Sequence, residues 1–486
     1  MTLRLACALA VALGCGAGCR QVFGFEDPLV DEGPDFEVTG THQQHVGRNN
    51  ALLEHEVTRR VAPVDELEPS VQLSDGSSQP VDYFDDGTFS FARNTPDELY
   101  RLTIGGVEYQ HTAANLVVDE YIPGRLDATP VTLPTLLEFR FTTAILGTPL
   151  ITSSGVFGVA NPQVPANSTA FDVDWSTVFQ LPRFGLLDAA ANDRLYVAFL
   201  EITPSPQQYL VATSLATFAV TQLDGVTTRL TSPPTPVTRS YCVRMQARRI
   251  RALDRLRAAL PQFGSFSADF RITQVPGFEH REVPHHVVVI DGTTGSDANV
   301  DVRYGTPFPA GRVHTGVAVF GRRDVAIPGV TQPLKLSIVG VQTSPLAPTV
   351  GCEPAIPTFD IGIPGALSLA GIPLTVDNVV LGVPNEDLEV TWMLTAPGPV
   401  DFTEVLLVEV DLSQPTPALH TRAVRRIRTV TQSAWIPRDV FVPGQRYVIL
   451  VRTITGNPRA AEGNFATFQY PAAYMQTMSS PFQVDG

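Results

Sequence analysis

Two groups of histidine and acidic residues are the first places in this sequence where a metal ion could bind. The first group holds His42, His45 and the run 54–56, and the second holds His280, Glu282, His285 and His286. A metal site needs three or four ligands that converge at about 2 Å, and neither group has a spacing that forces this. We therefore expect surface histidines on strands and turns, and predict neither a metal site nor a cofactor.

A third candidate is an acidic turn at residues 297–301. Asp297, Asn299 and Asp301 alternate as the first ligands of an EF-hand loop do, but Val302 stands where that loop needs Gly and Phe308 where it needs Glu. This excludes an EF-hand. A calcium-stabilised turn of another kind stays as an alternative, and we favour backbone hydrogen bonding by turn residues.

Motifs for catalysis are missing from the chain. It contains no Gly-x-Ser-x-Gly elbow and no His-Glu-x-x-His pair, and because Lys335 is its one lysine it has no phosphate loop ending in Gly-Lys. We expect a protein that is not an enzyme and has no catalytic residue. The alternative is a glycan or peptide hydrolase, with carboxylates such as Asp172, Asp174 or Asp291 assembled from distant strands.

An arginine-rich stretch is the one convincing helix in the sequence. Apolar residues follow helical spacing over 243–260, Pro261 ends the run, and arginines occupy the other face. These arginines suit anionic lipid headgroups or the acidic N-terminal region, but a solvated helix face is the simplest interpretation.

Cysteine usage predicts one disulfide. Five cysteines occur, and only Cys242 and Cys352 lie beyond the first 19 residues. Two cysteines in an exported chain suggest a bridge between them. The alternative is two separate buried thiols, since cysteine also packs as a small apolar residue.

The N-terminal segment predicts export. Arg4 precedes an apolar run at 5–13, and small residues lead to Cys19. The apolar run is shorter than the roughly 20 residues that span a bilayer, so it is typical of a signal peptide.

Residues 16–18 and Cys19 resemble the lipobox of bacterial lipoproteins, in which small residues precede an acylated cysteine. Gly16 departs from the Leu that the family prefers. The resemblance implies a signal peptide at 1–19, lipidation of Cys19, an acidic tether at 20–34, and a place in the cell envelope, at the outer membrane. Cys15 is a rival for acylation, and cleavage after Ala17 with free secretion is the other alternative.

Composition indicates an all-β chain of several β-sandwich domains with one Arg-rich helix. The 486 residues exceed one domain, and 41 Pro and 37 Gly separate short apolar runs. The formal net charge of −15 argues against nucleic acid as a partner, because phosphate binding needs clustered cations.

Residues 35–135 carry the run 86–91, Asp-Gly-Thr-Phe-Ser-Phe, followed by Tyr100-x-Leu102-x-Ile104. This order resembles transthyretin-like domains of the carboxypeptidase regulatory-like type, which implies a binding or structural module. Residues 136–350 read as a middle β region of one or two units that contains the helix at 243–260. Residues 351–375, rich in Pro and Gly, are predicted to be a linker.

Residues 376–486 carry Trp392 on an alternating strand and the strand Pro443-Gly-x-x-Tyr447-x-Ile449-x-Val451. The pattern resembles a fibronectin type III domain, although Phe402 stands where Tyr is more usual. The resemblance implies that Tyr447 is the tyrosine-corner residue, buried and bonded to backbone.

These observations predict a lipid-anchored envelope protein that binds or supports other molecules without catalysis. An envelope assembly or transport accessory is the second alternative. The expected partners of the lipid-anchored protein are the membrane, through the anchor, and an envelope protein or polysaccharide.

Overall fold

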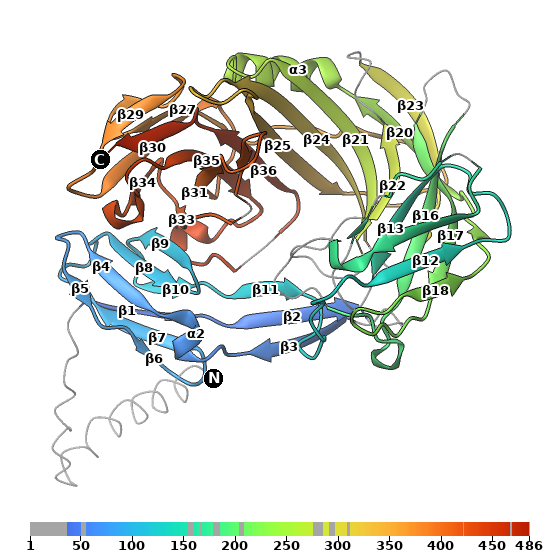
Figure 1. Ribbon diagram of the computed structural model, residues 1–486, viewed down its shortest axis with the longest axis horizontal. Coiled ribbons are helices and arrows are strands. Elements are labelled where there is room, and N and C mark those ends of the chain that lie inside the picture. The colour runs from blue at the N-terminus through green and yellow to red at the C-terminus, as the bar shows by residue number, and fades with distance from the viewer. Residues whose placement is uncertain are drawn as a thin grey trace, which may run out of the picture.

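The chain folds into β-rich units that follow one another around a ring (Figure 1). The computed structural model describes residues 36–49, 55–153, 159–160, 162–165, 167–177, 185–203, 209–275, 285–290, 297–308, 312–420, 422–466 and 469–485. The predicted signal peptide, Cys19 and the tether lie outside these residues. Within them the all-β, multi-domain prediction is confirmed.

The N-terminal unit is a sandwich of two sheets. Its strands are β1 (Glu37–Thr41), β4 (Ser70–Leu73), β5 (Ser78–Gln79), β6 (Asp82–Tyr83), β7 (Thr88–Ala92), β8 (Tyr100–Ile104), β9 (Val107–His111) and β10 (Asn115–Val117), with the short helix α2 (Val64–Leu67). One sheet has the order β10-β1-β7-β6, and the other pairs β5, β4, β8 and β9. Phe89 and Phe91 alternate inward from β7 and meet Leu102 of β8 in the core, as period-2 patterning requires.

A three-stranded ribbon leads from this unit to the next. It consists of β2 (Gln44–Asn49), β3 (His55–Arg60) and β11 (Glu120–Pro123), in the order β11-β2-β3. In Figure 1 the ribbon forms the lower side of the ring.

The second unit has its own aromatic core. Its strands are β12 (Leu136–Arg140), β13 (Thr148–Ser153), β14 (Val159–Ala160), β15 (Ala170–Asp174), β16 (Leu195–Ile202), β17 (Leu210–Phe218), β18 (Thr228–Thr231) and β19 (Thr235–Pro236), with 3-10 turns at Trp175–Thr177 and Ala189–Ala191. Phe139 and Phe171 stack at 4.7 Å between ring centroids. Trp175 is fully buried beside them, with its indole N–H donated to Gly185 O.

The third unit carries the longest helix of the described residues. Its elements are β20 (Tyr241–Ala247), α3 (Arg249–Ala259), β21 (Ser265–Val275), β22 (His285–Ile290), β23 (Ala298–Tyr304), β24 (Arg312–Val325), β25 (Leu334–Pro345) and β26 (Glu353–Ala355). The predicted middle region thus divides into two units, and Tyr196 and Ala198 of the second unit pack into the core of the third.

The predicted helix at 243–260 began too early. Residues 243–247 belong to β20, which pairs with β23 and β26. Val243, Met245 and Ala247 are buried at every second position, so their period is that of a strand. The helix starts after Arg248, and Asp297 accepts a hydrogen bond from the backbone N–H of Ile250 in its first turn.

The C-terminal unit is the largest. Its strands are β27 (Ile363–Leu369), β28 (Ile372–Pro373), β29 (Val379–Gly382), β30 (Leu388–Ala396), β31 (Phe402–Asp411), β32 (Ala418–Leu419), β33 (Arg425–Thr429), β34 (Ser433–Ile436), β35 (Arg446–Thr455), β36 (Ala472–Met478) and β37 (Phe482–Asp485), with 3-10 turns at Arg438–Val440 and Ala460–Glu462. Trp392 is buried against Leu407 and Ile449, between its two sheets.

The linker predicted at 351–375 is wrong, because most of it belongs to folded units. β26 pairs with β20, and β27 is an inner strand of the sheet β28-β27-β30-β34. Leu367 and Leu369 enter the C-terminal core. The Pro and Gly content reflects an irregular strand, because the pairing of β27 with β30 shifts register between Gly365 and Ser368.

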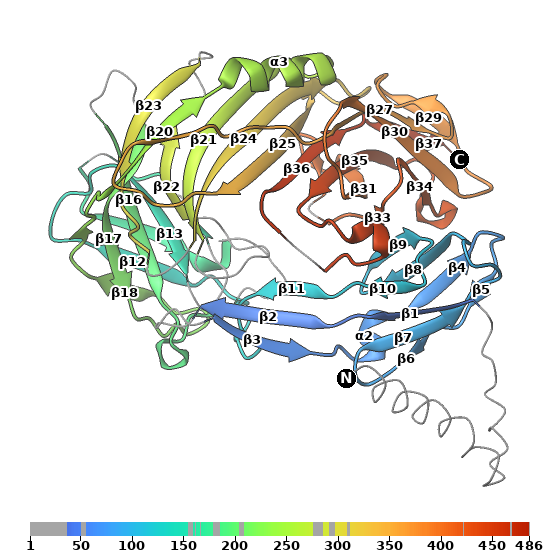
Figure 2. The same cartoon turned by 180° about the vertical axis from the view of Figure 1, so that it is seen from behind.

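Backbone hydrogen bonds join all four units. β17 of the second unit pairs with β22 of the third, β25 of the third with β36 of the C-terminal unit, and β33 of that unit with β9 of the N-terminal unit. One continuous sheet therefore runs through the molecule, and the last unit returns to the first (Figures 1 and 2). None of the helices in the described ranges is both long and apolar enough to cross a bilayer.

The predicted disulfide is present. Cys242 lies on β20 and Cys352 stands directly before β26, with 4.6 Å between their Cα atoms. Since Val243 pairs with Glu353 in the next position of this parallel ladder, the bridge fastens the end of β26 to β20.

Tyr447 occupies a tyrosine corner, as expected. Its side chain is fully buried, its hydroxyl accepts from Val442 N at 2.8 Å, and it donates to Val440 O at 3.3 Å. The two bonds fix the chain where it enters β35.

Replacing Tyr447 with Phe should lower the free energy of unfolding by about 1–3 kcal/mol, because a buried backbone N–H and C=O lose their partner. The measurement is the urea unfolding curve of the full chain. Tyr83→Phe is the matched control, since Tyr83 is partly exposed and donates to His42 O, where water can replace it. A Tyr447→Phe midpoint equal to that of the control would contradict a stabilising corner.

Removing the disulfide with Cys242→Ser and Cys352→Ser should lower the free energy of unfolding by about 2–5 kcal/mol, because the bridge closes a long loop in the unfolded chain. The sequence separation is 110 residues. The check is a thermal melt, together with thiol titration of the unfolded, non-reduced parent. Two reactive thiols at these positions in the parent would show that the bridge does not form.

Candidate functional site

The junction between β9 and β33 is the strongest polar centre in the described part of the chain. The two strands pair in parallel, with Ile427 opposite Glu108, Arg428 opposite Tyr109 and Thr429 opposite Gln110. Successive residues point to opposite faces, so this short ladder places charged groups on both sides of the sheet.

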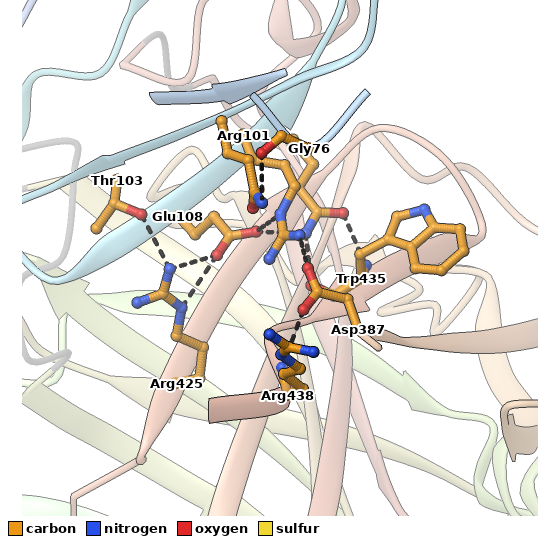
Figure 3. A network of polar contacts seen from close by, with 10 residues as sticks. Gly76, Arg101, Thr103, Glu108, Asp387, Arg425, Trp435 and Arg438 are labelled. Carbon is orange, nitrogen blue, oxygen red and sulfur yellow. Dashed lines mark hydrogen bonds and ion pairs between the residues drawn. The ribbon is translucent and has the colours of Figure 1, made fainter. Parts of the chain in front are cut away.

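One face carries a carboxylate–arginine network (Figure 3). Glu108 is 1% exposed and accepts from Arg101 Nε at 2.9 Å and from Arg425 Nε at 3.0 Å. Arg101 also binds Asp387, which accepts from the backbone N–H of Arg438 at 3.0 Å. Glu108 and Arg101 come from the N-terminal unit and the others from the C-terminal unit, so the network joins the two.

Gln110 adds a second link on this face. Its side-chain amide donates to Trp435 O at 2.8 Å and accepts from Trp435 N at 2.9 Å. The amide thus satisfies both backbone groups of one residue on β34, at the edge of the other sheet of the C-terminal unit. The N-terminal unit therefore contacts both sheets of its partner.

The opposite face carries a row of polar side chains across five strands, all buried except the partly exposed Arg452. Tyr109, Arg428, Glu404, Arg452 and Gln476 stand opposite one another on β9, β33, β31, β35 and β36. Residues in such register point to the same face and lie within contact of each other. We call this set the polar row.

Glu404 is the centre of the polar row and is shared by three arginines. One carboxylate oxygen accepts from Arg426 Nε at 2.7 Å and from Arg428 Nε at 3.4 Å, and the other accepts from Arg452 Nη1 at 3.1 Å. Glu404 is 2% exposed and Arg428 is 3% exposed, so both charges are buried. Arg428 also stacks over the Tyr109 ring, 5.6 Å from its centroid, and donates to its hydroxyl.

Charge balance sets the protonation of Glu404. Burial raises the pKa of a carboxyl group, but the positive charges of Arg426, Arg428 and Arg452 outweigh burial and lower the pKa of Glu404 to about 2. The carboxylate is therefore ionised at neutral pH. This arrangement provides electrostatic fixation of strands, because removal of one partner would leave an uncompensated buried charge.

The predicted histidine groups do not form a site in the described ranges. His42 is buried, and burial lowers its pKa although Glu120 and Asp119 oppose this. His45 lies 3.3 Å from Asp119. His285 and His286 lie on β22, while His280 and Glu282 fall outside the described residues. Among the described residues, no three His, Cys, Asp or Glu side chains are arranged to hold a metal.

The carboxylates considered for hydrolysis have structural partners. Asp172 accepts from Arg140 at 2.7 Å on the surface of the second unit. Asp174 accepts from the hydroxyl and N–H of Ser176, and the hydroxyl bond is the main cause of its lowered pKa. Asp291 falls outside the described residues. In the acidic turn, Asp301 pairs with Arg244 at 2.8 Å, so turn and strand bonding accounts for this carboxylate.

The arginines of α3 mostly bind the protein itself. Arg249 is buried and donates to Ile290 O, and Arg255 donates to the carbonyls of Phe359, Asp360 and Ile361. These bonds fasten the helix to the chain that enters the C-terminal unit. In Figure 1 the helix lies on the outer side of the ring across from the N-terminal unit, so it does not dock onto that unit.

The sequence did contain a signal for the polar row. Glu404 is the one charged residue in the otherwise apolar run 404–408, and arginines alternate with Ile427 on β33. A charge inside a strand that reads as buried calls for a partner. The signal identifies a buried ion pair, but it gives no information about which distant strand supplies the arginines.

Replacing Glu404 with Gln should lower the free energy of unfolding by about 3–5 kcal/mol at pH 7, because three arginines lose their buried counter-charge. In the parent, Glu404 has a folded pKa of about 2 against an ordinary value of 4.5. Its stabilisation is therefore complete above pH 4.5 and is lost as the pH falls towards 2.

The measurement is the urea midpoint between pH 2 and 7 for the parent, Glu404→Gln and the control Asp172→Asn, which removes an exposed pair of small expected effect. Glu404→Gln should remove part of the acid-dependent loss, and Asp172→Asn should not. Parallel pH curves for all three proteins would contradict a stabilising role for the Glu404 charge.

No family model matches this chain, and no curated protein matches it. Solved structures similar to parts of it are a streptococcal ancillary pilin (12% identity, 66% of this chain and 98% of that one, TM-score 0.11) and the FN1–FN3 domains of chicken CNTN1 (10% identity, 87% and 94%, TM-score 0.14). A third is Escherichia coli alpha-2-macroglobulin activated by porcine elastase, at 9% identity, 93% of this chain, 43% of that one and a TM-score of 0.15. These TM-scores are too low to carry an argument, so the assignment of β-sandwich units depends on the strands and cores described above.

Proposed function

We propose that this chain is a lipid-anchored protein of the bacterial cell envelope, at the outer membrane, and that it binds or supports partners without catalysis. The anchor rests on the sequence at 5–19, where an apolar run and small residues precede Cys19. The non-catalytic role is supported by the structural partners of Asp172 and Asp174, which the hydrolase alternative needs free.

The main support for this proposal is that the four units are fixed to one another. Sheet pairing at three junctions and the buried carboxylate of Glu108, which binds arginines of two units, hold the sandwiches in one arrangement. A rigid arrangement presents its surfaces in constant geometry, which lowers the entropy cost of binding a partner. This suits a protein that recognises or braces other envelope components.

The finer fold assignments belong to the same proposal. We infer that the N-terminal unit is transthyretin-like and that the C-terminal unit is of fibronectin type III kind. The buried Trp392 and the corner bonds of Tyr447 support the second assignment. Both are common types of binding and structural module.

The lipid anchor predicts a specific outcome in detergent phase partitioning. The parent should partition into the detergent phase, because each buried CH₂ of an acyl chain contributes about 0.8 kcal/mol. Cys19→Ser should move the protein to the aqueous phase, and Cys15→Ser should leave it in the detergent phase. Partitioning that persists when both cysteines are replaced would rule out lipidation.

The partner role is tested by crosslinking in intact cells. A photoreactive residue at Trp435 or Met393, both exposed on the C-terminal unit, should capture a defined envelope component. The same probe at Asp254, on the outer face of α3, serves as a comparison. Uniform labelling from all three positions, or turnover of glycan or peptide substrates by the purified chain, would contradict the proposal.

A further inference from the structure

One face of the continuous sheet carries a band of arginine and aromatic side chains that crosses from the third unit to the C-terminal unit. Its members are Phe320, Arg271, Tyr474, Arg452 and Arg426, from β24, β21, β36, β35 and β33. We call this set the inner band. Each is partly exposed, with 24% of the Arg271 side chain, 30% of Arg452 and 34% of Arg426 accessible.

Chain neighbours show which face the inner band occupies. Phe270, next to Arg271, is buried and lies under Arg249 of α3, so Arg271 points away from the helix. Val451, next to Arg452, enters the core of the C-terminal unit, so Arg452 points away from that core. Because α3 lies on the outer side of the ring in Figure 1, the band faces the inside of the ring.

Guanidinium groups and rings alternate along the band. Arg271 lies over the Phe320 ring at 5.7 Å from its centroid, and Arg452 lies over the Tyr474 ring at 5.4 Å. Burial raises the pKa of Tyr474, and the charges of Arg452 and Arg271 act in the opposite direction. Tyr474 is therefore near both arginines, which makes the band continuous across the junction of β25 and β36.

Positive charge is left over on this face. Arg426, Arg428 and Arg452 meet one carboxylate, Glu404, and Glu120 of β11 acts on Arg428 as well. Arg271 pairs with Asp269 on the same face, so four arginines against three carboxylates leave a balance of +1, in a chain whose net charge is −15. The excess is reachable, because Arg426 and Arg452 are the exposed members while Glu404 is buried.

We propose that the inner band binds an acidic polysaccharide, with uronate carboxylates on Arg452 and Arg426 and sugar faces on Tyr474 and Phe320. Planar guanidinium groups bind carboxylates through paired hydrogen bonds, and aromatic rings offer apolar faces between them. The band lies along a sheet surface from β21 to β33, with members on five of the seven strands in that stretch, which suits an extended polymer.

This inference rests on the proposed function, since it names a ligand class for a non-catalytic binding protein. The test uses the full chain in detergent and polygalacturonate as the probe, with binding followed by calorimetry. Dextran is the neutral comparison and poly-L-glutamate the charged non-sugar comparison. Polygalacturonate should bind at low salt and weaken as salt rises, and dextran should not bind.

Arg452→Gln should weaken polygalacturonate binding at least tenfold, while Arg452→Lys keeps part of it. Tyr474→Leu should weaken binding of polygalacturonate only, because poly-L-glutamate has no ring to stack. Arg257→Gln is the matched control, since Arg257 is an exposed arginine on α3, outside the band. Unfolding midpoints confirm that each variant folds, and Arg271→Gln replaces Arg452→Gln if the latter does not.

Three results would overturn the inference: no binding of polygalacturonate by the parent, equal binding of dextran, or equal binding of poly-L-glutamate with no effect of Tyr474→Leu. Specific crosslinking of the same preparation to an envelope protein, with no polysaccharide binding, would remove this inference and leave the proposed function standing. If neither polysaccharide binding nor specific crosslinking is observed, both this inference and the proposed function are contradicted.

Discussion

Backbone pairing between edge strands is the constraint on which this structure depends. A sandwich leaves rows of unpaired N–H and C=O groups at the edges of its sheets, and such edges are sites of unwanted association. Here β22 completes the edge at β17, β36 the edge at β25, and β33 the edge at β9. Because these bonds are part of the sheet itself, the units cannot rotate relative to each other without breaking a ladder.

Side-chain packing also crosses the boundaries between the units. Tyr196 and Ala198 of the second unit and Val448 of the C-terminal unit belong to the core of the third unit. Phe402 and Phe465 of the C-terminal unit belong to the core of the N-terminal unit. The hydrophobic contribution to stability is thus shared between neighbours, and isolated units would expose apolar surface.

Local pattern was enough to predict much of this architecture. Alternation predicted the strands around Phe89, Trp392 and Tyr447, and the corner bonds of Tyr447 followed from a short motif. The pair Cys242 and Cys352 could be identified by elimination. The start of α3 was misplaced because residues 243–247 fit a helix and a strand equally well, and only pairing with β23 decides between them.

The polar centre could not be predicted in the same way. Glu108 and Arg425 are 317 residues apart, and no local spacing relates them. The linker error has a similar cause, since Leu367 and Leu369 become core residues only when β30 is beside them. Features fixed by long-range pairing depend on the whole fold, whereas turns, alternation and caps depend on a few neighbours.

The closure of the ring also imposes an order in time. Chains grow at about 5–20 residues per second and their N-terminal domains fold first, so the separation of Glu108 from its partner corresponds to about 15–60 s of synthesis. For that interval β9 is an open edge and Glu108 has no Arg425 beside it. The N-terminal unit therefore lacks the neighbour of β9 until β33 has been made. A chaperone that shields this edge during that time would determine what fraction of the chains reaches the closed form.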